Sequence, residues 1–465
     1  MFRTLSIETT QKVGETVKLN GWVNNRRNMG KIVFLDVRDR WGIVQVVCVP
    51  GELDEVSQTA LSEVRSEFVL EIEGVVQARG EKQINANSPT GTVEILAKKI
   101  AVLSKAETPP FEIENETLQA GEELRLKYRY LDLRHERLTK NMVLRHKVAR
   151  AIREFFYGQD FLEIETPFIS KSTPEGARDF LIPSRHYPGK FFALPQSPQQ
   201  YKQLLMVAGQ EKYFQLARCF RDEDSRGDRQ PEFTQLDMEM SFVERDEVME
   251  LNERALIEVI KKVTPQKKIQ EIPFPKISYK EAMEKYGTDR PDLRVDKNDA
   301  NLLALCWIID FPFFEKTEEG GWTFTHNPFS LPQPQYLEQM MKKENIGEIL
   351  TTQYDVVLNG YEIGGGSIRA HMPAILQKTF EIMGYSEKEI QAQFGHMLEA
   401  FKYGTPPHGG IAWGFDRIVM LLAGEPNIRE VIPFPKTADN RDPLMDGPGE
   451  VSGVQLSELG INFKK

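Results

Sequence analysis

Apolar and polar residues alternate through most of the segment 15–105, which is the pattern of β-strands that bury one face. The turn sequence Asp39-Arg40-Trp41-Gly42 separates two of these runs and predicts a hairpin. Five strands in this space indicate a small closed barrel, so we assign 1–105 to an OB-fold, with another small β domain as the alternative. The strands are predicted at Val17–Val23, Ile32–Val37, Gly42–Val49, Phe68–Val76 and Thr92–Ala97.

The rest of the chain mixes helical and strand periods. Residues 106–135 contain Pro109-Pro110 and then a charged stretch, and we interpret them as a hinge. From Asn141 apolar residues recur at helical spacing as far as Gly158, and the extended segment Phe161–Ile169 follows. The pattern predicts an α+β domain over 136–465. Further strands are expected at Tyr213–Cys219, Gln235–Phe242, Asp355–Ile363 and Gly410–Trp413, and helices near Asp246–Lys262, Gln335–Glu344 and Glu387–Lys402.

Composition places the chain among soluble proteins of two or three domains. It has 465 residues, of which 40% are hydrophobic and 28% are charged. No apolar run reaches the roughly 18 residues of a membrane span, and the N-terminus lacks the apolar core of a signal peptide. Three widely spaced cysteines suggest neither a zinc site nor a disulfide framework. We therefore predict a cytoplasmic protein with no membrane partner.

Charge is distributed unevenly. The net charge is −10, which argues against indiscriminate binding of nucleic acid. Residues 1–105 hold 14 Lys and Arg against 13 Asp and Glu, a balance of +1. If RNA is a partner, the N-terminal segment repels it least, and specific contacts depend on local basic clusters and exposed aromatic side chains.

Three segments contain the candidate chemistry. They are Gly158–Ile169 (GQDFLEIETPFI), Phe220–Thr234 (with FRDE and RQPEFT) and Gly410–Arg417 (GIAWGFDR) before an apolar helix. No P-loop is present, and Gly364-Gly365-Gly366-Ser367 alone indicates only a glycine-rich turn. In this order the three segments resemble the signature motifs of class II aminoacyl-tRNA synthetases. The segments between them, such as TPEGARDFLIPSR and NGYEIGGGSIR, resemble the bacterial aspartyl members, as does the N-terminal barrel.

The resemblance implies a catalytic domain built on an antiparallel sheet with flanking helices. It also implies attack of the aspartate carboxylate on the α-phosphorus of ATP, which needs charge stabilisation and no protein nucleophile. Arg221 would bind the α-phosphate and the aspartate carboxylate, and Arg417 the γ-phosphate, because Arg offers a planar fork. Glu223, the third residue we assign as catalytic, would accept from the adenine, and Phe233 would stack on it. The other implied ATP contacts are Asp222, Gln230, Glu362, Gly414, Phe415 and Asp416, and Asp355 and Glu362, expected on one strand, would hold Mg²⁺.

The resemblance also implies how aspartate is selected. Lys202 and Arg369 would face its side-chain carboxylate, so that asparagine would leave their charge unpaired. Glu175 and Gln199 would bind the amino end, while Ser197, Asp237 and His326 complete the pocket. His326 is followed by Asn327 where bacterial relatives commonly have a second His.

The same resemblance makes the barrel the reader of the tRNA(Asp) anticodon. Phe34 would be a stacking platform, and alternation along its strand puts it on the exposed face with Ile32 and Asp36; a core position is the alternative. Met29 and Lys82 look more like enzymes that charge tRNA(Asp) alone than like the non-discriminating form that also charges tRNA(Asn). The other anticodon contacts implied are Arg26, Arg27, Gln45, Arg79 and Glu94.

Two expectations concern assembly and size. The resemblance implies a homodimer whose interface is Gly158–Ile169, with Pro167 near its centre. Bacterial aspartyl enzymes usually carry an inserted domain between the second and third motifs, and the short segment near 262–305 predicts that it is reduced or absent. A catalytically inactive RNA-binding paralogue, or an asparaginyl or lysyl synthetase, is the alternative to an active aspartyl enzyme.

Overall fold

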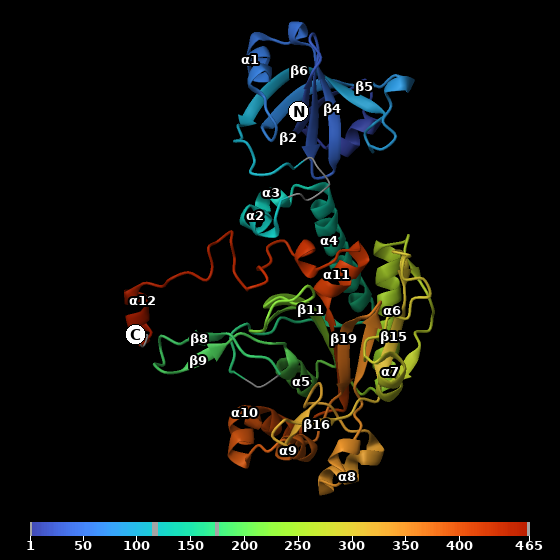
Figure 1. The fold of residues 1–465 in the computed structure, drawn as a ribbon, viewed down its shortest axis with the longest axis vertical. Helices are drawn as coiled ribbons and strands as arrows, with labels where there is room; N and C mark the ends of the chain where they lie inside the picture. The colour runs from blue at the N-terminus through green and yellow to red at the C-terminus, as the bar shows by residue number, and fades with distance from the viewer. Residues whose placement is uncertain (1, 114–119, 173–175, 463–465) are drawn as a thin grey trace. The chain divides into compact units, whose positions relative to one another are not determined.

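The computed structural model describes residues 2–113, 120–172 and 176–462, and the chain forms two compact units, Met1–Thr139 and Lys140–Lys465 (Figure 1). No helix among the described residues is long and apolar enough to cross a bilayer.

The first unit is a closed barrel. Its strand order is β1-β2-β3-β4-β6-β5, and pairing of β2 with β5 closes it. The predicted OB-fold is confirmed; the sequence did not predict α1 (Glu55–Glu63), which lies between β4 and β5 and is capped by the Asp54 side chain. The strands are β1 (Arg3–Thr4), β2 (Thr16–Asn28), β3 (Val33–Asp39), β4 (Gly42–Cys48), β5 (Val69–Ala78) and β6 (Val93–Ser104).

Short helices occupy much of the predicted hinge. They are α2 (Glu122–Lys127) and α3 (Arg129–Asp132), and α4 (Glu136–Gly158) follows them. Helix α4 therefore begins before Asn141, where the apolar period first becomes regular, and ends at Gly158 as predicted. The boundary between the two units falls inside α4.

The second unit is built on an eight-stranded sheet of order β13-β15-β18-β19-β20-β11-β10-β7. Its pairings are antiparallel except β13 with β15 and β10 with β7. One core cluster joins apolar residues of α4, α6, α11 and the sheet, including Phe156, Trp307 and Trp413. The strands are β7 (Leu162–Glu163), β10 (Lys212–Phe220), β11 (Glu232–Ser241), β13 (Lys276–Ser278), β15 (Leu305–Ile309), β18 (Tyr354–Leu358), β19 (Tyr361–Ile368) and β20 (His408–Gly414).

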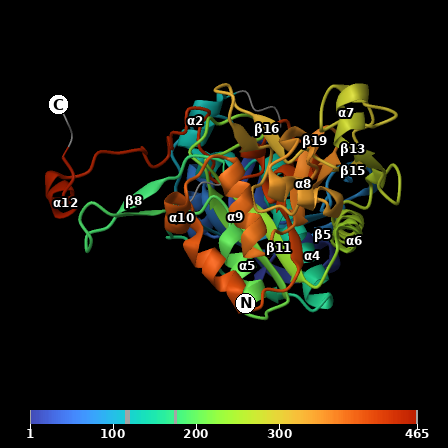
Figure 2. The same ribbon diagram turned by 90° about the horizontal axis from the view of Figure 1, so that it is seen from below.

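Helices flank this sheet, and a second core cluster includes apolar residues of α9 and α10 (Figure 2). The short hairpin of β8 (Leu181–Pro183) and β9 (Phe191–Ala193) extends away from the sheet in both views. The helices are α5 (Gln199–Val207), α6 (Arg245–Val263), α7 (Tyr279–Tyr286), α8 (Leu337–Lys342), α9 (Pro373–Ile382), α10 (Glu387–Ala400), α11 (Phe415–Ala423) and α12 (Gly453–Glu458). Two further strand pairs are β12 (Lys268–Ile269) with β14 (Leu302–Leu303) and β16 (Phe314–Lys316) with β17 (Trp322–Phe324).

Two strand predictions were wrong in extent. The run Asp355–Ile363 is not one strand but the hairpin of β18 and β19, because Asn359 (φ 50°) and Gly360 (φ 87°) adopt left-handed conformations that turn the chain. Of the segment Phe161–Ile169, only Leu162–Glu163 pairs as a strand. The hairpin brings Asp355 and Glu362 from neighbouring strands to one side of the sheet, where both line a single cavity.

Candidate active site

Two cavities adjoin on the sheet of the second unit. One has a volume of about 220 Å³ and the other about 240 Å³. Four residues line both of them, namely Arg221, Gln235, Glu362 and Ala412. The first cavity contains Glu223, Phe233 and Arg417, and the second contains Lys202, Asp237 and Arg369. Most of the predicted ATP residues thus line the first cavity and the predicted aspartate residues line the second, and both Arg221 and Glu362 line the two.

Arg221 stands at this junction, directly after β10 ends at Phe220. Its guanidinium carbon lies 5.2 Å from the centre of the Phe233 ring, and its Nε is buried without a hydrogen-bond partner. The part of the chain that the structure describes shows no ion pair to Arg221. A partly buried guanidinium without a carboxylate partner gains from pairing with an anion, so this side chain is suited to bind an anion that enters from either cavity.

Arg417 lies in the first turn of α11 and lines the first cavity, which we call the nucleotide cavity because the predicted ATP residues line it. Its Nη1 donates to the backbone carbonyl of Glu362, and its Nη2 lies 3.1 Å from Oδ2 of Asp228. Its Nε is buried without a partner. Glu223 also has an ion pair, because its Oε2 lies 3.6 Å from Nη1 of Arg229.

Some residues predicted to contact ATP also have partners within the protein. The Gln230 side chain donates to the carbonyl of Lys436 and accepts from its amide, and Asp416 accepts from the Arg145 guanidinium and from the Thr234 amide at 2.8 Å. Phe415 is buried in the core cluster. Asp222 lines a neighbouring hollow and not the nucleotide cavity. Gln230, Asp416 and Gly414 nevertheless lie in the cavity wall.

The second cavity, which we call the aspartate cavity because the predicted aspartate residues line it, contains a buried charge network. Lys202 Nζ is 3.0 Å from Asp237 Oδ2 and 3.3 Å from Glu239 Oε2. Arg369 donates to both oxygens of Glu239 and to Ser367 Oγ. The expectation that asparagine would leave the charges of Lys202 and Arg369 unpaired is therefore wrong, because Asp237 and Glu239 already pair with them. The sequence did not single out Glu239, whose partners are far away along the chain.

Burial and charge shift the proton affinities in this network in opposite directions. Loss of solvation raises the pKa of Asp237 to about 6, although Lys202 and Arg369 oppose the shift. The pKa of Glu239 is lowered, because its ion pairs with Arg369 and Lys202 outweigh its own burial. Glu239 therefore remains ionised at neutral pH and holds both cations in place.

The remaining predicted pocket residues line the same cavity. Ser197, Gln199 and His326 are among its lining residues, and the side-chain amide nitrogen of Gln199 and Nδ1 of His326 are buried without partners. Loss of solvation lowers the pKa of His326, against the influence of nearby carboxylates. Glu175 lies outside the described residues. Gln353 and Asn327 also line the cavity, and the sequence did not predict either as a pocket residue.

Asp355 and Glu362 fit a divalent cation that also binds substrate phosphates. A Cβ on Gly365 would stand 2.7 Å from Asp355 Oδ1 and 3.7 Å from Glu362 Oε1, so only a glycine leaves space between these carboxylates. Burial and the charge of Glu362 raise the pKa of Asp355 well above its usual value, and a cation would relieve both effects. Among the described residues no three His, Cys, Asp or Glu side chains converge as a metal site. Mg²⁺ commonly uses one or two carboxylates with phosphates and water.

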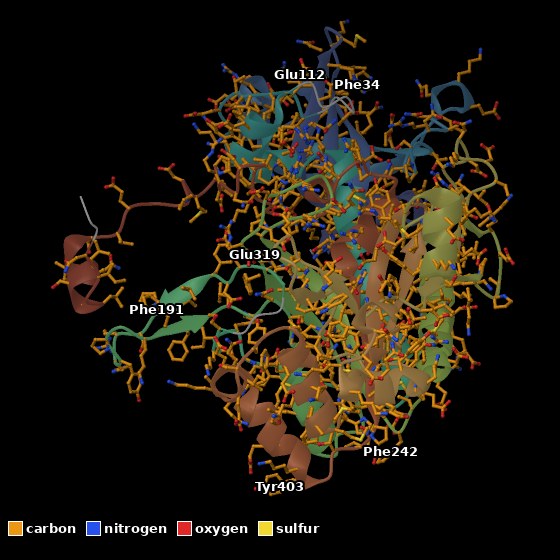
Figure 3. The ribbon with its side chains drawn as sticks, turned by 60° about the horizontal axis from the view of Figure 1, so that its bottom comes forward. Phe34, Glu112, Phe191, Phe242, Glu319 and Tyr403 are labelled. Atoms are coloured by element: carbon orange, nitrogen blue, oxygen red, sulfur yellow. The ribbon has the colours of Figure 1, made fainter. Side chains whose placement is uncertain are left out.

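The outer side of β3 carries the Phe34 ring beside polar side chains. Val33, Leu35 and Val37 are buried, while Phe34 (labelled in Figure 3) and Asp36 are half-buried on the outer side of β3, as alternation predicted. The Arg27 guanidinium lies 5.5 Å from the Phe34 ring centre, and it also donates to Asp36 and Gln45. Gln45 in turn donates to Glu94, which lies 3.7 Å from Arg79. The Nε of Arg26 is buried and unpartnered.

Two family models match the chain. Residues 121–438 match the model for class II tRNA synthetases (D, K and N), and residues 17–103 match the model for the OB-fold nucleic acid binding domain.

Relatives match over nearly the whole chain. A protein of Geobacillus sp. strain WCH70 named aspartate–tRNA(Asp/Asn) ligase is 42% identical, covering 98% of this chain and 97% of the relative. One of Geobacillus kaustophilus named aspartate–tRNA ligase is 40% identical over 97% of this chain and 96% of its own. The first alignment spans 584 residues, 119 more than this chain has, so the relative contains residues with no counterpart here. That these residues form the inserted domain expected between the second and third motifs stays a prediction.

Solved structures show the same fold. Asparaginyl-tRNA synthetase of Pyrococcus horikoshii with asparaginyl-adenylate superposes with a TM-score of 0.74 at 25% identity, over 92% of this chain and 96% of the other. Aspartyl-tRNA synthetase of Entamoeba histolytica gives a TM-score of 0.72 at 25% identity, over 94% and 91%.

Proposed function

Because this chain belongs to the aspartate–tRNA ligases among the class II tRNA synthetases, we propose that it activates L-aspartate with ATP and transfers it to the 3′ end of tRNA(Asp). The observation that supports this best is the sharing of Arg221 between two cavities, one lined by Glu223 and Phe233 and the other by Lys202 and Arg369. Activation joins an oxygen of the aspartate α-carboxylate to the α-phosphorus of ATP, and the position of Arg221 in both cavities supports its binding both anionic groups.

In this proposal an oxygen of the aspartate α-carboxylate attacks the α-phosphorus, and the bond from that phosphorus to pyrophosphate breaks. Arg221 binds both anions and balances the charge that develops between them. Phe233 stacks on the adenine, Glu223 accepts from its amino group, and Arg417 holds the γ-phosphate. Asp355 and Glu362 would hold Mg²⁺, which supplies positive charge to the phosphates when bound. A ribose hydroxyl of the tRNA then displaces AMP from the aspartyl carbonyl.

We propose that the barrel reads the anticodon through Phe34 and the polar residues around it. An aromatic ring on the outer side of an OB barrel, flanked by guanidinium groups, suits stacking of a base. A wider specificity for tRNA(Asn) is a second candidate, because the relative from strain WCH70 has a name that covers both tRNAs.

We also propose that the protein is a homodimer located in the cytoplasm. The segment 158–169 of the first motif carries the half-exposed apolar side chains of Leu162, Phe168 and Ile169, which supports burial against a second copy. Sedimentation at micromolar concentration tests the homodimer, and a monomer would contradict it. The three cysteines are buried free thiols, consistent with the predicted cytoplasmic location.

The proposed activity is tested by aspartate-dependent exchange of labelled pyrophosphate into ATP by the purified chain. We expect exchange that requires aspartate and Mg²⁺. Lack of exchange by a folded sample would refute the activation step, and it would support the inactive paralogue instead.

A further inference from the structure

The loop between β10 and β11 carries two adjacent charged residues, and each pairs with a charged residue of the nucleotide cavity. Asp228 Oδ2 is 3.1 Å from Arg417 Nη2, and Arg229 Nη1 is 3.6 Å from Glu223 Oε2. Asp228 and Arg229 both line this cavity. These two residues thus pair with the groups assigned above to the γ-phosphate and to the adenine.

The Arg417 guanidinium cannot keep this pair and also bind a phosphate through the same edge. Its Nη1 already donates to the carbonyl of Glu362, which leaves Nη2 and the buried, unpartnered Nε for an anion. A carboxylate and a phosphate oxygen are alternative acceptors for that edge. The side chains of Arg417 and Asp228 are 21% and 22% exposed, so the pair is partly shielded from water but remains accessible to a ligand.

We propose that Asp228 is a positioning residue that acts through Arg417, because its carboxylate competes with the terminal phosphates of ATP and pyrophosphate for the Arg417 guanidinium. The proposal rests on the assignment of Arg417 to the γ-phosphate. It gives Asp228 two effects: ATP must displace the carboxylate from Arg417 on binding, and the returning carboxylate weakens the hold on pyrophosphate after activation.

The rest of the loop is anchored, so the exchange of partners requires only side-chain rotation. The Gly227 carbonyl accepts from the Ile428 amide at 2.9 Å, and Gln230 is bonded to the backbone of Lys436. On the other side, the Glu223 carbonyl accepts from Asn440 at 3.0 Å. Asp228 therefore stays beside the cavity whether or not it touches Arg417.

The test compares Asp228→Asn with wild type in aspartate-dependent pyrophosphate exchange. We expect the KM for ATP to fall about two- to five-fold, the change that loss of a competing, partly exposed ion pair produces. The KM for pyrophosphate should fall by a similar factor, and the KM for aspartate should not change. Asp228→Glu should restore wild-type constants, and Asp224→Asn, an exposed aspartate of the same loop, should have no effect.

An unchanged or raised KM for ATP in Asp228→Asn would overturn the proposal. If it rises and more Mg²⁺ is required, Asp228 is a metal ligand; if every constant worsens, its role is structural. Asp228→Ser is the second variant if the first does not fold. Different results would count against the proposed function itself: no aspartate-dependent exchange by wild type, or full activity of Arg417→Ala.

Discussion

Glu239 and Arg369 form a buried bidentate ion pair, with Arg369 Nε 2.9 Å from one carboxylate oxygen and Nη2 3.1 Å from the other. The same carboxylate lies 3.3 Å from Lys202. The pocket cations are thus balanced before any ligand arrives. If Lys202 and Arg369 bind the aspartate side-chain carboxylate, as we propose, asparagine loses that charged contact, but it leaves neither cation unpaired.

This network predicts the effect of Lys202→Met. Removal of the ammonium leaves Asp237 and Glu239 facing the substrate carboxylate, so aspartate activation should fall far more than asparagine activation. We expect the ratio of their kcat/KM values to drop by on the order of 100-fold. A ratio is insensitive to the folded fraction of the variant. Lys212→Met, on β10 outside both cavities, is the matched control, and a preserved ratio in Lys202→Met would remove Lys202 from side-chain recognition.

Arg221→Ala and Arg417→Ala should each lower pyrophosphate exchange by about 100- to 1,000-fold, equivalent to about 2.7–4 kcal/mol, because each removes charge stabilisation at a different phosphate. Arg150→Ala is the control, since Arg150 is exposed on α4, pairs with Glu154 and lines neither cavity. Near wild-type exchange in either of the first two variants would show that the site is assigned incorrectly.

Phe34→Ala should weaken tRNA charging while leaving aspartate activation intact, because the ring lies on the barrel and not in either cavity. Loss of a stacked base costs about 1–3 kcal/mol, or roughly 5- to 150-fold in kcat/KM for tRNA. Leu35→Ala is the matched variant, since Leu35 is fully buried and its truncation should lower the free energy of unfolding. Equal losses in both assays for Phe34→Ala would mean that the ring serves the fold.

His408 predicts a pH dependence of stability. It is fully buried, and loss of solvation lowers its pKa to about 4, so the folded state takes up no proton between about pH 6.5 and 4 while the unfolded state does. The stability that the neutral His408 contributes is fully present above pH 6.5. As the pH falls towards 4, the free energy of unfolding decreases by up to about 3 kcal/mol from this source. The free energy of unfolding, measured with urea at pH 4.5 and pH 7, should differ less between the two pH values in His408→Gln than in wild type. The exposed variant His186→Gln should match wild type, and an unchanged slope in His408→Gln would refute this origin.

Local pattern was sufficient for much of the fold and for some of the site. Alternation placed the Phe34 ring correctly on the outer side of β3, since it depends only on strand geometry. The hairpin at Asn359-Gly360 was missed although both residues favour that turn. Glu239 could not be recognised from the sequence, because its partners Lys202 and Arg369 come from α5 and the end of β19. Asp416, by contrast, was predicted from its motif to contact ATP, but its carboxylate accepts from Arg145 and from the backbone amide of Thr234, which the sequence did not predict.

The central claim is tested most directly by attachment of labelled aspartate to purified tRNA(Asp) and tRNA(Asn), side by side, with labelled asparagine as the second amino acid. The account predicts aspartyl-tRNA(Asp) and no asparaginyl product on either tRNA. Aspartate on tRNA(Asn) as well would establish the wider specificity within the same family. Asparagine as the preferred amino acid, or no aminoacyl-tRNA from an enzyme that is folded and saturated with ATP and Mg²⁺, would contradict it.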